Sequence, residues 1–134
     1  MNLKTTALII SLFFLSTSFA KKTEEIYFIT PKNNEIVKPT FKVKFSNTGL
    51  VVKPAGEDID NKKAGHYHII IDSKFIPAGQ MIPMDPQHIH YGKGQTEAEL
   101  SLSRGVHTLT LQFADGAHRS YGEKLSQTIT VNVK

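Results

Sequence analysis

The sequence contains no cysteine. The chain therefore forms no disulfide and offers no thiolate to a metal ion, so an apolar core alone must hold the fold. It also lacks a Gly-rich phosphate loop and a serine in a nucleophile elbow. Nucleophilic catalysis has no residues to rest on, and we predict that the protein is not an enzyme.

The sequence also lacks a strong charge of one sign. It has 16 Lys and Arg against 12 Asp and Glu, a formal net charge of +4. The basic residues are scattered and form no stripe interleaved with aromatic residues, which argues against nucleic acid as a partner. No apolar run beyond the N-terminus approaches the roughly 20 residues that a transmembrane helix needs. We therefore expect no stable insertion into a membrane once the N-terminus has been processed.

The N-terminus has the three parts of a secretory signal peptide. Lys4 supplies a short positive region, residues 7–15 form an apolar stretch, and Ser18-Phe19-Ala20 places small residues at the cleavage site. Cleavage after Ala20 divides the chain into a signal peptide, residues 1–20, and a single domain, residues 21–134. We expect the mature domain to be periplasmic or secreted.

The mature chain has the pattern of an all-β protein. Residues 41–45 alternate strictly between apolar residues and lysine, as in a half-buried strand. Residues 127–133 also alternate, with Ile129, Val131 and Val133 on one face and polar residues on the other. Further strands are predicted over residues 26–29, 66–72, 98–102 and 106–113. Short strands separated by Gly, Pro and Asn turns predict an immunoglobulin-like β-sandwich of roughly seven short strands.

Two long connections interrupt this regular pattern, residues 53–65 and 75–95. The second holds several prolines and glycines. Connections of this length in a compact domain are usually functional or disordered.

Four of the six histidines form two His-x-His pairs, His66-Tyr67-His68 and His88-Ile89-His90. Residues two apart in a strand point to the same face, so each pair can present two imidazoles side by side. Four nitrogen ligands without a thiolate suit Cu(II), or Zn(II) if the geometry is tetrahedral. We therefore expect a copper or zinc site with His66, His68, His88 and His90 as ligands. The alternative is that these histidines only hydrogen-bond backbone groups.

Two further residues have alternative roles, and a third has one expected role. His118 follows a predicted turn at residues 114–117 and is either a fifth ligand or an exposed surface residue. Asp72 shares a predicted strand face with His66 and His68, so it either fixes a ring tautomer or caps the following turn. His107 shares a face with apolar residues of its strand and is expected to be a hydrogen-bonded core histidine.

A second hypothesis needs no metal. The histidines, together with Tyr67, Tyr91 and Gln95, would line a polar and aromatic surface that binds a protein or glycan of the cell envelope. Sandwich folds commonly serve as such scaffolds, although this is an argument by analogy.

Several segments resemble the bacterial domain-of-unknown-function family 4399, and the resemblance covers nearly the whole mature domain. The segments that carry it are residues 26–33, 52–56, 65–72, 88–97 and 105–109. The resemblance implies an exported, β-rich, histidine-bearing domain and brings no activity with it. The sequence departs from the family pattern at Tyr67 and Tyr121, where many members carry a further histidine. If those histidines bind metal in the family, this chain has fewer ligands.

Overall fold

A computed structural model describes residues 23–134. The predicted signal peptide, residues 1–20, lies outside the described residues. The described part forms nine strands and one 3₁₀ turn: β1 (Glu25–Thr30), β2 (Glu35–Val37), β3 (Thr40–Thr48), β4 (Val51–Val52), β5 (Ala64–Ile71), β6 (His88–Tyr91), β7 (Glu97–Ser101), β8 (Gly105–Ala114), η1 (Glu123–Leu125) and β9 (Ser126–Val133).

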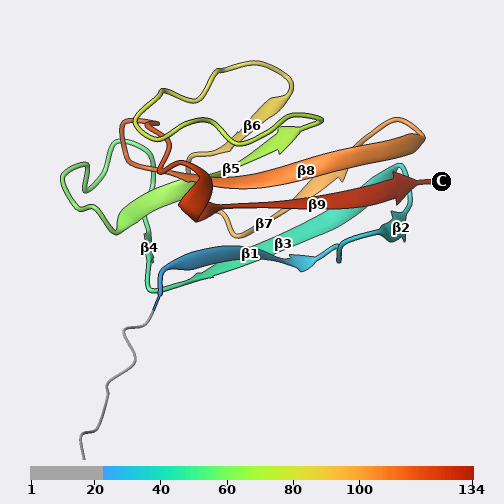
Figure 1. Ribbon diagram of the computed structural model, residues 1–134, viewed down its shortest axis with the longest axis horizontal. Coiled ribbons are helices and arrows are strands. Elements are labelled where there is room, and N and C mark those ends of the chain that lie inside the picture. The colour runs from blue at the N-terminus through green and yellow to red at the C-terminus, as the bar shows by residue number, and fades with distance from the viewer. Residues whose placement is uncertain (1–22) are drawn as a thin grey trace, which may run out of the picture.

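The strands form two sheets that pack face to face. The three-stranded sheet has the order β1-β3-β7, and the six-stranded sheet has the order β2-β9-β8-β5-β4, with β6 paired to β5. Figure 1 shows β1 and β3 in the lower layer and β5, β8 and β9 in the upper layer. The predicted all-β, immunoglobulin-like sandwich is confirmed.

The six predicted strands are all present, with ends displaced by a few residues. The three additional strands are short, with two to four residues each. β4 ends where the first long connection begins, β6 lies inside the second, and both pair with β5. These short strands extend the sheet beside β5.

β5 is the central element of the larger sheet, and all eight of its residues are buried. Tyr67, Ile69 and Ile71 face the main hydrophobic core between the sheets. His66 and His68 alternate with them and therefore lie on the opposite face, yet they are only 0% and 2% exposed. The outer face of β5 must consequently be covered by other segments.

A polar network fastens the connections to that outer face. The Gln112 side chain on β8 is fully buried, and its Nε2 donates to the carbonyl oxygens of Gly122 and Leu125. Its Oε1 accepts a hydrogen bond from the amide of Ile76, in the connection before β6. The segments before β6 and after β8 are thus both anchored to one side chain.

Within residues 23–134, no helix is long and apolar enough to cross a membrane.

Candidate metal centre

β5 and β6 place three imidazoles on one face of the sheet. The two strands are antiparallel, and His68 lies directly opposite His90 in their register. Cross-strand partners project their side chains to the same face. Since His66 is two residues before His68, all three rings meet on the outer face of the larger sheet.

Gly92 makes space for the His90 ring. A Cβ atom at position 92 would lie 2.2 Å from Cε1 and 2.4 Å from Nε2 of His90. Any other residue there would displace the imidazole or the backbone. This glycine was not expected to matter, although its position two residues after the second histidine pair was visible in the sequence.

A tight turn after β8 brings in the fourth imidazole, that of His118. The Asp115 carboxylate organises the turn by accepting hydrogen bonds from the amides of Ala117 and Arg119 and from Nε of Arg119. His118 takes a left-handed conformation with φ of 64°, and its amide donates to the Asp115 carbonyl oxygen. The turn built on Asp115 thus positions His118.

The four rings form one compact group, which we call the four-histidine cluster: His66, His68, His90 and His118. Nε2 of His66 is 3.1 Å from Nε2 of His68, and Nε2 of His90 is 3.2 Å from Nε2 of His118. Potential ligand atoms of the first three histidines all lie within 4.8 Å of one another. Nitrogen atoms at this spacing can share one ion.

The cluster is arranged more like a tetrahedron than a square. Five of the six distances between ring centroids are 4.7–5.0 Å, and the sixth, from His68 to His118, is 6.1 Å. A regular tetrahedron has six equal distances. A square of the same edge would have two diagonals of roughly 7 Å, so a planar arrangement fits poorly.

Burial keeps the inner imidazoles uncharged. Burial, helped by the neighbouring His90 and His118, lowers the pKa of His66 to about 4. Burial among the other histidines lowers the pKa of His68 to about 2. Burial and then His118 also lower the pKa of His90. The neutral imidazole is the form that binds metal, so these rings need lose no proton at neutral pH.

The inner rings are held by packing more than by hydrogen bonds. Nδ1 of His66 and Nδ1 of His68 are buried and have no hydrogen-bond partner among the described residues. Metal-ligating histidines usually donate their second ring N–H to a carboxylate or carbonyl group. This support is missing for the two inner rings.

His88, expected as a ligand, has a different partner. Its Nδ1 lies 2.7 Å from Oδ1 of Asp85, and the same oxygen accepts hydrogen bonds from the amides of Gln87 and His88. His88 pairs with Ile70 in the register, two positions further along the sheet than His90. The structure therefore brings His118, and not His88, into contact with the other three histidines.

Asp72, expected beside the first histidine pair, contacts His107 instead. Asp72 lies just beyond the end of β5 with φ of 54°, so the alternation of faces no longer applies to it. Its carboxylate accepts hydrogen bonds from His107 Nδ1, at 2.7 Å, and from the Thr108 amide.

His107 is hydrogen-bonded as expected, but it is the third residue of β8 and its side chain is 15% exposed. Its Nε2 is 2.9 Å from the Ser103 carbonyl oxygen, so both ring nitrogens face acceptors. The hydrogen bond to Asp72 raises the pKa of His107.

The two tyrosines expected on a binding surface are buried. Tyr67 is 0% and Tyr91 is 5% exposed, and both pack in the main core. The alternation that exposes the histidines to the outer face sends Tyr67 inward, where its hydroxyl accepts a hydrogen bond from Asn47 Nδ2. Gln95 is half-buried and accepts a hydrogen bond from the Lys93 amide.

Comparison with solved structures gives two distant similarities. The X-ray structure of the endo-β-1,4-mannanase from Thermotoga petrophila has 12% identity and a TM-score of 0.47, with 90% of this chain and 21% of that chain covered. The fibronectin(III)-like modules of Clostridium thermocellum CbhA have 13% identity and a TM-score of 0.47, with 85% of this chain and 48% of that chain covered. The chain thus spans about a fifth and about half of these two chains.

No curated protein sequence matches this chain. A family model does: the domain of unknown function DUF4399 matches residues 43–134, which include β5, β6, β8 and all four residues of the cluster. This is more than half of the chain and confirms the resemblance seen in the sequence. The chain belongs to the DUF4399 family.

Proposed function

We propose that this protein binds a transition-metal ion through Nε2 of His66, His68, His90 and His118. The observation that carries the proposal is the convergence of four imidazoles from three segments of the chain, with Nε2 atoms 3.1 Å and 3.2 Å apart in two pairs. Four nitrogens bound to zinc at about 2.0–2.1 Å in a tetrahedron lie roughly 3.4 Å apart. The two Nε2 pairs are already close to that spacing.

The arrangement favours zinc over Cu(II). Cu(II) prefers square-planar or tetragonal nitrogen sites, whereas Zn(II) is bound tetrahedrally and accepts imidazole readily. The ring-centroid distances support the tetrahedral arrangement. A bound ion would use all four histidines and keep no position open for a substrate, which supports a binding or structural role for the metal.

We further propose that the domain acts outside the cytoplasm. The N-terminal sequence has the pattern of a cleaved signal peptide. In a periplasmic or extracellular compartment, a nitrogen-only site does not compete with the thiols of the cytosol. Mass spectrometry of the protein from an envelope fraction is expected to show a chain that begins at Lys21.

Metal titration tests the proposal. Metal-free wild-type protein is titrated with Zn(II) and with Cu(II) by calorimetry, beside the variant His66→Gln/His90→Gln. The matched controls are His88→Gln and His107→Gln, which remove imidazoles outside the cluster. Wild type and both controls should bind one equivalent, and the double variant should lose binding by at least about 100-fold. Equal binding by wild type and double variant, or none by wild type, overturns the proposal.

The coordination is tested separately. X-ray absorption of the zinc-loaded protein should show four nitrogen neighbours at about 2.0–2.1 Å. The variant His118→Gln should reduce this number by one while one equivalent of zinc still binds. An unchanged spectrum would remove His118 from the ligand set.

A further inference from the structure

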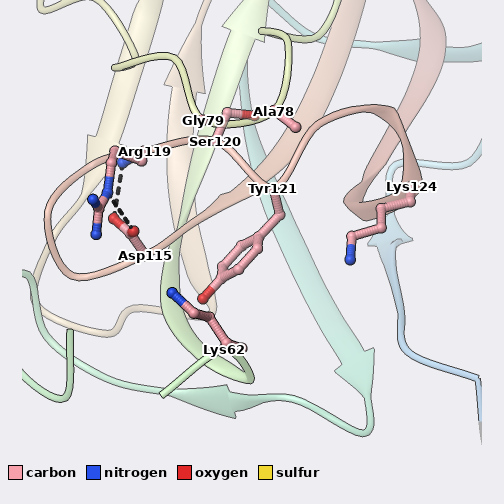
Figure 2. Close-up of a pocket in the computed structure, with 8 residues that line it drawn as sticks. All are labelled: Lys62, Ala78, Gly79, Asp115, Arg119, Ser120, Tyr121 and Lys124. Atoms are coloured by element: carbon pink, nitrogen blue, oxygen red, sulfur yellow. Dashed lines mark hydrogen bonds and ion pairs between the residues drawn. The ribbon is translucent and has the colours of Figure 1, made fainter. Parts of the chain in front are cut away.

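A cavity of about 390 Å³ lies beside the four-histidine cluster and is separate from it. Three parts of the chain supply its walls: Lys62 from the connection before β5, Ala78 and Gly79 from the connection before β6, and the segment after β8 that ends with Lys124 in η1. Figure 2 shows these residues around the side chain of Tyr121. Its volume is in the range of small-molecule sites.

The neutral polar groups in this cavity already have partners. Ser120 Oγ donates to the Ile76 carbonyl oxygen and accepts a hydrogen bond from the Gly122 amide. The Tyr121 hydroxyl donates to the Ala64 carbonyl oxygen at 2.8 Å. These groups shape the cavity but leave few donors for a ligand.

The polar groups that remain available to a ligand are cationic. Lys62 and Lys124 are exposed and form no ion pair with any described residue. Arg119 uses Nε on the Asp115 carboxylate, so its two terminal nitrogens remain as donors. In the view of Figure 2, Arg119 lies on one side of Tyr121 and Lys124 on the other, with Lys62 below.

The two carboxylates that act electrostatically on Tyr121, those of Asp115 and Glu24, are engaged elsewhere. Asp115 accepts three hydrogen bonds from its own turn, including the one from Arg119. Glu24, which influences Tyr121 electrostatically, forms an ion pair with Lys63 at 2.9 Å. The lining residues therefore carry three positive charges and one negative charge, a net charge of +2.

We propose that this cavity binds a small organic polyanion, a molecule that carries at least two phosphate or carboxylate groups. Arg119 would bind an anionic group through its planar guanidinium, and the two lysines would act as point charges on the other. The flat ring of Tyr121 provides the floor between them. This site uses no residue of the four-histidine cluster and does not depend on metal binding.

The experiment uses two probes that share the charge but differ in chemistry. Metal-free protein is titrated calorimetrically with pyrophosphate and with citrate at low and at high salt. The variant Lys62→Gln/Lys124→Gln is compared with Lys38→Gln/Lys42→Gln, which removes the same charge from an exposed turn and from β3. The control variant distinguishes specific binding in the cavity from nonspecific electrostatic attraction of anions to the protein.

At least one probe should bind wild type, more weakly at high salt. The Lys62/Lys124 variant should lose about tenfold or more in affinity, and the control should stay within about twofold of wild type. The probe that binds more tightly identifies phosphate or carboxylate as the preferred group. The proposal is overturned if neither probe binds wild type at about 10 mM, or if the two variants lose affinity equally. Zinc binding by the Lys62/Lys124 variant should be unchanged, so failure here leaves the metal site untouched.

Discussion

Acid should destabilise this protein through the two inner histidines of the cluster. His66 and His68 have pKa values of about 4 and about 2 when folded, against 6.5 in the unfolded chain. Below pH 6.5 the unfolded chain therefore binds protons that the folded protein does not. Since a pKa lowered by folding makes the protein less stable as the pH falls, stability should decrease from pH 6.5 down toward each folded pKa.

The size of this effect can be worked out between pH 7 and pH 5. Over that interval, protonation of each histidine in the unfolded chain lowers the free energy of unfolding by about 2 kcal/mol, or about 4 kcal/mol for the two together. This is a large part of the 5–15 kcal/mol that is typical of whole domains. The aspartates whose pKa is lowered, Asp72 and Asp85, start from 3.8 and titrate below this interval.

The assay is urea unfolding of metal-free protein at pH 7 and pH 5, followed by tyrosine fluorescence, since the chain has four tyrosines and no tryptophan. The comparison variant is His66→Gln/His68→Gln, which cannot be protonated at these two positions. Wild type should lose about 4 kcal/mol more than the variant on acidification. Equal losses in the two proteins would refute the idea that burial keeps these rings neutral.

Three further outcomes follow from particular contacts. Gly92→Ala should weaken zinc binding by about tenfold or more, because the Cβ of the alanine would collide with the His90 ring. An unchanged zinc affinity in calorimetry would contradict this expectation. His107→Gln should destabilise the protein more at pH 6 than at pH 9, because a raised pKa of His107 adds stability that is lost as the pH rises. In urea unfolding, a loss of unfolding free energy that becomes larger with rising pH would contradict the ion pair with Asp72. Gln112→Leu should cost about 3 kcal/mol or more in thermal or urea unfolding, because it removes the buried hydrogen bonds to the Ile76 amide and to the Gly122 and Leu125 carbonyl oxygens. A cost below about 1 kcal/mol would show that water replaces the side chain.

The strands could be predicted because their apolar residues repeat with a period of two. β3 and β9 were predicted in this way, whereas the strand at residues 66–72 was predicted from its apolar centre. β2 and β4 have only three and two residues, too few for a repeat to be visible. β6 has four, and it is a strand because it pairs with β5, which is a tertiary contact that the local sequence does not contain.

The candidate site was predicted in part for the same reason. Alternation predicts that His66 and His68 share one face of their strand, and the pairing of β6 with β5 brings His90 to that face. His118 enters from a turn 28 residues away from His90, and no periodicity could show that it, and not His88, completes the cluster. Asp72 was expected on the strand face of His66 and His68, but β5 ends one residue before it, and its carboxylate accepts a hydrogen bond from His107.

The positions of the four histidines along the chain have a consequence for folding. They lie in three segments joined by two loops of roughly 20 to 30 residues, from His68 to His90 and from His90 to His118. An ion held by all four would act as a cross-link between these segments. In the chain-entropy account, closing one loop of this length stabilises a fold by about 3.5 kcal/mol. In a chain without cysteine, an imidazole-bound ion would thus supply the kind of covalent-like restraint that exported domains commonly obtain from disulfides.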